Sequence, residues 1–363
     1  MTKTIQQNTA QQLAEYKKII DKDITAFSQQ LLKNTSKEYN RTVEQMVDAY
    51  AGILSRGGKR LRGALVMHAY FMAGGTDKKL AVHAARCIEM VHAYLLIVDD
   101  IADCSETRRS GLAAHKMLEQ HHEKNNLYGE GKHFGTSQAM HVALFGLHCA
   151  IEEMTKLTMA DATKIAALSH LNQSLITTIA GQLSDVYNEA LREVSEQNVR
   201  QVLTWKTAYY SFLNPLQFGV ILAGKDLNDY PWLNKYAVHV GLSFQITDDI
   251  LGVFADESES GKSTLDDLRE GKITLLVAKT LQKATISQKK TFLDILGKQI
   301  ISRQEQKAVR DIMQKSGALQ ETKDIASEEA AKAIFALAEA PIELQRYIRF
   351  FDGLALYIRQ RRS

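Results

Sequence analysis

Prolines are almost absent from this chain, with only three among 363 residues. Proline breaks the interior of a helix, so a chain this poor in proline favours long, uninterrupted helices. Apolar residues also recur at helical spacing along most of the sequence. No linker and no low-complexity segment divides it. We therefore predict an all-α protein that forms a single domain over residues 1–363.

The composition excludes several classes of function. A net charge of +3 is too small to indicate nucleic-acid binding. The three cysteines have no metal-ligand spacing and predict free thiols in a reducing cytoplasm. No apolar run approaches the roughly 20 residues that span a bilayer, and the N-terminus lacks the apolar segment of a signal peptide. We expect a cytoplasmic protein without a membrane span.

Several elements can be expected from periodicity and punctuation. Residues 1–55 predict two amphipathic helices, Ala10–Leu32 and Thr42–Leu54, joined by a polar segment at 34–40. Residues 80–104 predict a largely buried helix. The polar, glycine-punctuated stretch 119–137 predicts a loop, as does 255–272.

Residues 92–109 carry the strongest chemical signal. His92, Leu95, Asp99 and Asp103 fall in one stripe along a helix, after the apolar run 94–98. Two carboxylates one turn apart repel each other unless a cation or proton lies between them. Mg²⁺ is usually bound by one or two carboxylates together with water and phosphate oxygens. The stretch therefore predicts a magnesium-bridged phosphate site.

Basic residues next to glycines or acids suggest anion binding. Arg108 and Arg109 directly follow the acidic stripe, and arginine forks match phosphate oxygens in pairs. Upstream, Gly57-Gly58 allows a tight turn before Lys59 and Arg62 at the start of a helix. The second group can equally be a solvated loop with an ordinary basic helix start.

A second acidic pair repeats the first. Gln245, Asp248, Asp249 and Gly252 occur near the end of another apolar helix. One such pair can be a surface feature. Two pairs, each with basic residues downstream, can face each other across a helical bundle and bind metal between them.

Three lysines remain open on residue pattern alone. Lys206, beside Thr207 amid aromatic residues, can reach toward water or point into a cavity. Lys262 and Lys272 lie in the predicted loop beside the second acidic helix, where they can be mobile surface charges.

Over roughly residues 40–363 the chain resembles the trans-isoprenyl (polyprenyl) diphosphate synthases. Five motifs carry the resemblance in the family's order: Gly57-Gly-Lys-Arg-Leu-Arg62, Asp99-Asp-Ile-Ala-Asp103 with Glu106-Thr-Arg-Arg109, Lys206-Thr207, Gln245-Ile-Thr-Asp-Asp249, and Gly261-Lys262 through Asp267-Leu-Arg-Glu-Gly-Lys272. The resemblance implies a helical bundle around a deep central cavity, usually a homodimer. It also implies addition of isopentenyl diphosphate to an allylic diphosphate (dimethylallyl, geranyl or farnesyl).

The resemblance also implies roles for single residues. Asp99, Asp103 and Asp248 correspond to the ligands of Mg²⁺, which binds as three ions with the allylic diphosphate, while Asp100, Asp249 and Gln245 support them. The residues that correspond to the allylic diphosphate site are Arg108, Lys206, Thr207 and Lys262, with Lys272 also near substrate. Those that correspond to the isopentenyl diphosphate pocket are Lys59, Arg62, His92 and Arg109, closed by Arg361 and Arg362.

Tyr94 and Leu95 correspond to positions that control product length. A bulky residue at position 94 forms part of the tunnel floor in relatives, which implies a C15 or C20 product.

Two departures from the family pattern stand out. Gly252 replaces the third aspartate that usually ends the second motif, and Ser110-Gly-Leu follows the arginines where many members have Gly-Pro-Thr. Two other functions remain conceivable on the same fold. A terpene cyclase needs no pocket for a second diphosphate, and a non-catalytic partner subunit should have lost the aspartates.

Overall fold

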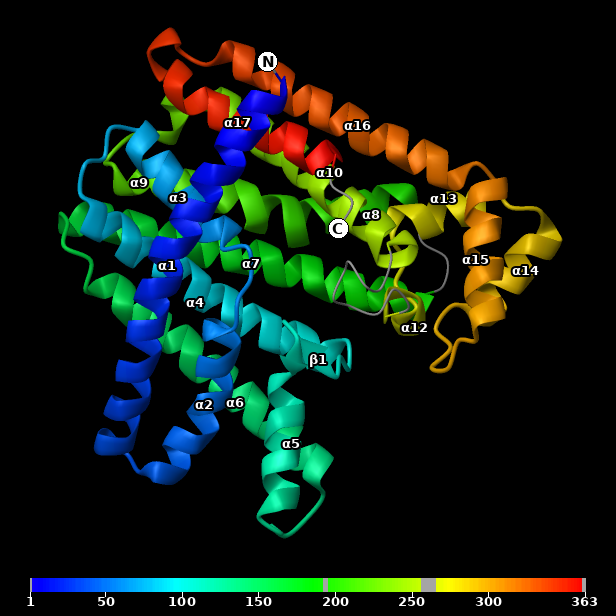
Figure 1. Cartoon of the computed structure of the whole chain (residues 1–363), viewed down its shortest axis with the longest axis horizontal. Coiled ribbons are helices and arrows are strands. Elements are labelled where there is room, and N and C mark those ends of the chain that lie inside the picture. Colours follow the sequence, from blue (N-terminus) through cyan, green and yellow to red (C-terminus); the bar gives the residue numbers. More distant parts are fainter. Residues whose placement is uncertain (1, 192–194, 256–265, 361–363) are drawn as a thin grey trace. The chain divides into compact units, whose positions relative to one another are not determined.

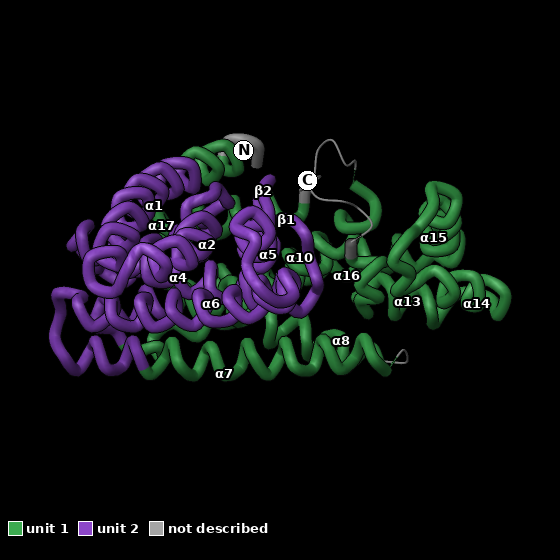
Figure 2. Tube along the Cα trace, turned by 90° about the horizontal axis from the view of Figure 1, so that it is seen from below, with its two compact units in different colours: residues 1–11, 169–217, 226–363 green, residues 12–168, 218–225 purple. Residues whose placement is uncertain are grey.

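The computed structural model describes residues 2–191, 195–255 and 266–360. Figure 1 shows that helices make up nearly all of the described chain, which confirms the predicted all-α class. Contacts between Cα atoms divide the chain into two compact units, coloured in Figure 2. That both form one domain stays a prediction.

Unit 2 comprises residues 12–168 and 218–225. Its elements are most of α1 (Thr2–Glu38), then α2 (Arg41–Ser55), α3 (Leu61–Met72), α4 (Lys78–Ala102), the hairpin β1 (Thr107–Arg108) and β2 (Gly111–Leu112), α5 (Ala114–Lys124) and α6 (Gly131–Thr155). Tyr50 of α2 is fully buried, and its hydroxyl donates to the carbonyl of Met90 on α4 at 2.9 Å. A Cβ at Gly146 of α6 would lie 2.1 Å from the Tyr50 ring, so this ring needs a glycine opposite it.

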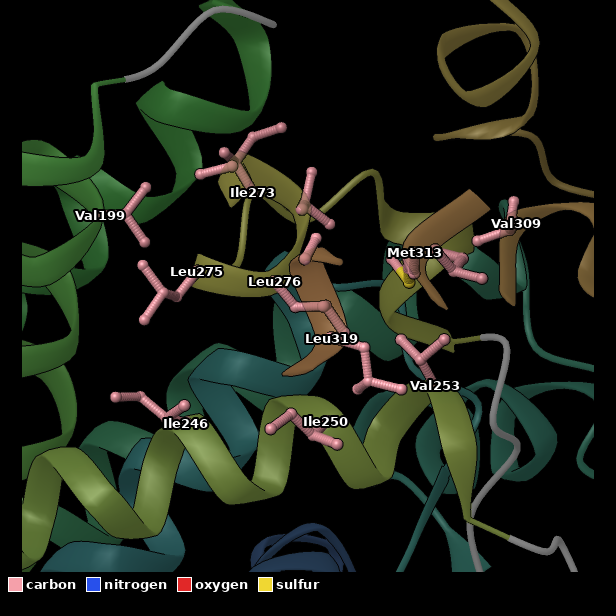
Figure 3. Close-up of a cluster of buried hydrophobic side chains, with 14 of the residues drawn as sticks. Val199, Ile246, Ile250, Val253, Ile273, Leu275, Leu276, Val309, Met313 and Leu319 are labelled. Atoms are coloured by element: carbon pink, nitrogen blue, oxygen red, sulfur yellow. The ribbon is translucent and has the colours of Figure 1, made fainter. Parts of the chain in front are cut away.

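Unit 1 comprises residues 1–11, 169–217 and 226–363. It contains most of α7 (Asp161–Leu191), then α8 (Glu196–Val202), η1 (Leu203–Leu213), the start of α9 (Asn214–Leu222), η2 (Leu227–Asp229), α10 (Pro231–Phe254), α12 (Asp266–Glu270), α13 (Leu275–Lys283), α14 (Ile286–Ile295), α15 (Arg303–Lys315), α16 (Ala318–Ala336), η3 (Leu337–Glu339), η4 (Ile342–Leu344) and α17 (Gln345–Gln360). Helix α10 packs against η1, α16 and α17. Buried side chains of α10, α13, α15 and α16 form one apolar cluster at its carboxyl end (Figure 3).

The structure corrects two of the expected loops. The expected loop 255–272 also contains a short helix, α12 (Asp266–Glu270), and its residues 256–265 lie outside the described residues. The segment 119–137 is mostly helical, because α5 runs to Lys124 and α6 begins at Gly131. Its glycines serve close packing: a Cβ at Gly135 would lie 2.4 Å from the carbonyl oxygen of His115 on α5. Helix α1 also continues to Glu38 through the polar segment 34–40, where the buried hydroxyl of Thr35 donates to the Leu31 carbonyl at 2.8 Å.

Element η1 is a π-helix of 11 residues, and it carries the Lys206-Thr207 pair. It ends at Leu213, and α9 begins at Asn214, directly before Pro215, whose ring would clash with a carbonyl four residues earlier in a regular α-helix. The Asn214 N–H instead donates to the Tyr209 carbonyl, five residues back. Two glycines allow η1 to pack closely against its neighbours. A Cβ at Gly181 of α7 would lie 2.7 Å from the backbone nitrogen of Lys206, and one at Gly241 of α10 would lie 2.6 Å from the Ala208 Cα.

Helix α4 is the one described helix that is long and apolar enough to cross a membrane. Its most apolar window is 56% buried inside the structure, as in the core helix of a soluble protein. Length and composition alone are therefore weak grounds for a span here.

Acid should weaken a half-buried ion-pair group that joins α4 to α6. Glu153 accepts hydrogen bonds from His83 at 3.1 Å and from Arg86 at 2.6 Å. Its pKa is lowered to about 2 by the hydrogen bonds from His83 and Lys156 and by the charge of Arg86. A carboxyl with a lowered folded-state pKa stabilises the fold above its unfolded pKa, and this contribution is lost as the pH falls from about 4.5 to about 2. We expect Glu153→Gln to lower the melting temperature at pH 6 and to have a much smaller effect near pH 3. The exposed neighbour Glu152 gives the control, Glu152→Gln. An equal deficit at both pH values would contradict the assignment.

Candidate active site

The first acidic motif lies at the end of α4. Asp99 and Asp103 are both half-buried and one turn apart, and the Asp103 N–H donates to the Asp99 carbonyl at 2.9 Å just past the last helical residue. His92 and Leu95 are half-buried on the same stripe, whereas Tyr94 is buried. Burial raises the pKa of the Tyr94 hydroxyl, so it stays protonated at neutral pH. The stripe thus presents two accessible carboxylates at the spacing predicted from the sequence.

A β-hairpin turns Arg108 back onto this helix. In the turn, Arg109 and Ser110 both have positive φ, as a two-residue hairpin of type I′ requires. The Arg108 Nε donates to Asp100 Oδ1 at 2.7 Å, Nη2 also bonds to Asp100, and Nη2 lies 3.9 Å from Asp99 Oδ2. Burial alone would lower the pKa of Arg108, but the bonds to fully buried Asp100 raise it overall. A fixed cation therefore lies beside the accessible carboxylate of Asp99.

The turn after α2 holds the other arginine of the hairpin. Arg109 Nη1 donates to the carbonyls of Ile53 at 2.9 Å and Arg56 at 3.1 Å. Gly58 has φ +101°, and a Cβ there would lie 3.0 Å from the Arg109 guanidinium carbon. Burial and the nearby charge of Arg60 lower the pKa of Arg109 to about 10, which keeps it charged at neutral pH.

The basic residues that start α3 have different roles. Arg60 is buried and pairs with Asp21 at 2.7 Å and Glu89 at 3.4 Å, so it holds the fold together. Lys59 is exposed. Arg62 Nη1 lies 3.1 Å from Nε2 of His92.

His92 lies in a strongly positive environment. Its pKa is well below the usual value, first because of burial and then because of the charges of Arg62, Arg109, Arg108 and Arg60. A neutral ring lets Nε2 accept from Arg62. Concentrated positive charge of this kind attracts anions.

The second acidic motif lies near the end of α10 in unit 1. Asp249 is buried and accepts from Gln245 Nε2 at 2.7 Å. Burial raises its pKa to about 7, with Lys272 opposing the shift and Asp267 adding to it. Asp248 is half-exposed. Of this pair, Asp248 is the more accessible carboxylate.

Lys206 of η1 forms an ion pair that the sequence did not predict. Its Nζ donates to Asp185 Oδ2 of α7 at 2.8 Å, and both side chains are mostly buried. Thr207 beside it is half-buried. Asp185 follows Gly181 by one turn on α7, so both lie on one helix face. An acid next to a small residue on one face is the only signal in the sequence for this ion pair.

Not all of the predicted site residues are among those that the structure describes. Lys262, Arg361 and Arg362 fall outside the described residues. In the ranges that are described, no group of three or more His, Cys, Asp or Glu side chains is placed to hold a metal ion without other ligands. Asp99 and Asp103 belong to unit 2 and Asp248 to unit 1, and that they bind the same ions stays a prediction.

Comparisons with known proteins agree on one family. A family model described as polyprenyl synthetase matches residues 43–314. The chain is 31% identical over 332 residues to a geranylgeranyl diphosphate synthase of Saccharolobus solfataricus, covering 92% of this chain and 94% of the relative. It is 32% identical to the geranylgeranyl diphosphate synthase of Sulfolobus acidocaldarius, covering 75% and 78%. The structure of geranylgeranyl pyrophosphate synthase from Corynebacterium glutamicum, complexed with isoprenyl diphosphate and magnesium, has a TM-score of 0.89 at 27% identity and covers 96% of this chain and 99% of that one.

Proposed function

This chain belongs to the polyprenyl synthetase family, and on that premise we propose that it is a trans-prenyltransferase that adds isopentenyl diphosphate to an allylic diphosphate. Dimethylallyl, geranyl and farnesyl diphosphate are the candidate primers. The observation that carries the proposal is the presence of two acidic helix ends together with a separate group of cations around His92. The two acidic helix ends suit the diphosphate that leaves with metal. The cations around His92 suit the second diphosphate, which stays attached to the product.

The donors on α4 and α10 fit magnesium. Asp99, Asp103 and Asp248 offer carboxylate oxygens at accessible positions, and Mg²⁺ prefers a few carboxylates with the rest of its ligands from water and phosphate. We propose that these three residues hold three ions with the allylic diphosphate. When bound, the ions neutralise the charge that grows on the leaving diphosphate.

The chain's own cations complete this stabilisation. Lys206, fixed by Asp185, and Arg108, fixed by Asp100, are held in place before substrate arrives. Preorganised charges of this kind stabilise a transition state without a reorganisation cost. We assign the allylic diphosphate to these two residues with Thr207, Lys262 and Lys272. Gln245 contributes by donating a hydrogen bond to Asp249.

The second diphosphate belongs to the cations around His92. We propose that Lys59, Arg62, His92 and Arg109 bind isopentenyl diphosphate, with Arg361 and Arg362 closing the pocket. A terpene cyclase takes one diphosphate and has no use for this group. A non-catalytic partner subunit does not need Asp99, Asp103 and Asp248, which are all retained here.

The assay for this function uses purified protein, Mg²⁺, isopentenyl diphosphate and each allylic primer in turn. We expect diphosphate release that needs both substrates, and a dephosphorylated product of 15 or 20 carbons by chromatography. Release from the allylic substrate alone, with a cyclic hydrocarbon as product, would favour a cyclase. No release with any primer would contradict the proposal.

Product length should depend on Tyr94, which is buried five residues before Asp99. We propose that its ring and Leu95 form the floor of the tunnel for the growing chain. Tyr94→Ala removes the ring, so we expect products longer than those of the unmodified enzyme under the same assay. Tyr128→Ala, at a fully exposed tyrosine, is the control. An unchanged distribution of products would show that Tyr94 is not the floor.

An exposed apolar stripe on α7 supports a homodimer. Its members recur at helical spacing: Ile176, Ile179, Leu183, Tyr187 and Leu191. Leu183 is 68% exposed, and monomers rarely expose contiguous apolar surface. We propose that a second copy of this chain covers the stripe. Leu183→Asp should sediment as a monomer where the unmodified chain is a dimer. Ile300→Asp, at a residue 83% exposed and off α7, should remain dimeric. A dimer in both variants would place the interface elsewhere.

The three cysteines are free thiols, and burial raises the pKa of the Cys87 and Cys149 thiols above their usual value. We propose that the protein is cytoplasmic, because a reducing compartment keeps cysteines as free thiols.

A further inference from the structure

Helix α14 of unit 1 has a buried inner face and an exposed apolar outer face. Phe292 and Ile295 belong to the apolar cluster that also contains Val309 of the neighbouring helix α15 (Figure 1). Ile286 and Leu293 are seven residues apart and share the other side of the helix, where both are exposed. Ile286 is 90% exposed. The inner face therefore holds α14 to the fold, while the outer face leaves large aliphatic side chains in solvent.

The turn between α14 and α15 exposes a third large aliphatic residue, Ile300. Its neighbour Ile301 is buried in the apolar cluster, whereas Ile300 itself points outward and is 83% exposed. The Gly297 N–H donates to the Leu268 carbonyl of α12 at 2.8 Å, which fixes this turn. Ile300 is thus exposed on an anchored part of the backbone.

Positive charge is concentrated in the same segment. Residues 283–303 contain five basic residues and one acidic residue, a net charge of +4 within a chain of +3, so the rest of the chain is close to neutral. Lys289 and Lys290 follow Ile286 by three and four residues and share its helix face. Among the residues that the structure describes, no acid pairs with Lys289, Lys290 or Arg303. The exposed aliphatic residues therefore lie among cations that have no counter-charge nearby.

This combination restricts what can cover the outer face of α14. Contact of this face with the same face of a second copy would bring like charges together. A nucleic acid would neutralise the cations but leave the isoleucines without an apolar partner. An anionic bilayer meets both requirements, because aliphatic side chains enter the boundary of the acyl chains while lysines extend their ammonium groups to the lipid headgroups.

We propose that an anionic membrane surface binds the α14 surface, which consists of Ile286, Leu293 and Ile300 with Lys289 and Lys290. This docking goes beyond the proposed function, because no substrate takes part in it. The two are compatible, since a prenyl diphosphate is an amphiphile that a bilayer takes up.

Sedimentation of the purified protein with vesicles tests the docking without turnover. We expect binding to vesicles of equal parts phosphatidylcholine and phosphatidylglycerol, and much weaker binding to phosphatidylcholine alone, because each basic residue near an anionic surface adds to the affinity. Added salt should weaken the binding. If the protein does not bind the anionic vesicles at low salt, the docking is wrong, an acidic protein becomes the better partner, and the proposed function still stands.

Two lysine pairs separate the α14 surface from general attraction of the protein to anionic lipid. Lys289→Gln with Lys290→Gln should weaken binding to the anionic vesicles by about tenfold. The matched control, Lys315→Gln with Lys323→Gln, makes the same charge change at exposed lysines of α15 and α16 and should bind as the unmodified protein does. Thermal melting checks that each variant is folded. Equal affinities in the two double variants would overturn the docking.

Quenching by brominated lipid shows which side chains enter the bilayer. Bromine on the acyl chains quenches a tryptophan whose ring reaches the hydrocarbon, and the signal of the two native tryptophans is subtracted with the unmodified protein. Ile286→Trp should be quenched on anionic vesicles. Ile342→Trp, at a residue of η4 that is 75% exposed, should not be. Vesicle binding without added quenching of Ile286→Trp would place the membrane contact elsewhere and overturn the docking.

Discussion

Asp99→Asn should reduce kcat/KM for the condensation by about 10³-fold or more. The substitution keeps the shape of the side chain but removes a charge at the accessible end of α4. Two consequences follow together. The site loses a ligand for Mg²⁺, and the Arg108 guanidinium, 3.9 Å away, loses part of the negative charge that balances it. Diphosphate release measured over a range of Mg²⁺ concentrations checks the prediction.

The Mg²⁺ range distinguishes the causes of such a loss. If Asp99 is a ligand, more Mg²⁺ should recover part of the activity in Asp99→Asn. Asp48→Asn, at an exposed acid on α2, should behave as the unmodified enzyme. Retention of more than about a tenth of kcat/KM at ordinary Mg²⁺ would contradict the assigned role.

Lys206→Met should reduce kcat by about 10²-fold, because it removes a fixed cation from beside the leaving diphosphate. Nζ of Lys206 is held 2.8 Å from Asp185 Oδ2, so the charge is already in place before substrate binds. Asp185→Asn weakens this hold and leaves Lys206 itself present. We expect a smaller loss, about tenfold, from that variant.

The control for Lys206 lies on α10. Lys235 is an exposed lysine that pairs with Glu339, and Lys235→Met should leave the kinetics unchanged. If Lys206→Met lowers the melting temperature but leaves kcat intact, the ion pair with Asp185 is purely structural. That result would remove Lys206 from the proposed mechanism.

The two acidic helices were predictable because the spacing of apolar residues along the sequence indicates where such helices form. Apolar residues before Asp99 and Asp248 indicate buried helices, and a spacing of four residues fixes Asp99 and Asp103 on one face. The structure adds a bond of the same spacing that we did not predict, from Gln245 Nε2 to Asp249 Oδ1 at 2.7 Å. Local sequence was sufficient wherever a regular helix sets the geometry.

Other features depend on contacts between residues far apart in sequence. The ion pair of Lys206 and Asp185 joins two helices, and its only local hint is that Asp185 follows Gly181 by one turn. The hairpin places non-glycine residues, Arg109 and Ser110, at positive φ, where propensity alone would favour asparagine or glycine. Its two bonds from Arg109 Nη1 to carbonyls of the turn after α2 help to hold that conformation.

Glycines show why the loop at 119–137 was wrongly predicted. Glycine can mark a turn or a close approach of two helices, and sequence alone does not separate these meanings. Gly135 and Gly146 of α6 both lie inside a helix against a neighbour. Gly252 is a third such case, and there the close neighbour is a carboxylate.

The proposed function requires that the acids of α4 and α10 bind the same diphosphate through shared ions. A crystal structure of the protein with Mn²⁺ and an unreactive allylic thiodiphosphate tests it, because Mn²⁺ is located by its anomalous scattering. We expect a single group of Mn²⁺ ions around one diphosphate, contacting Asp99, Asp103 and Asp248. Ions bound at α4 and at α10 with no diphosphate in common would contradict the claim.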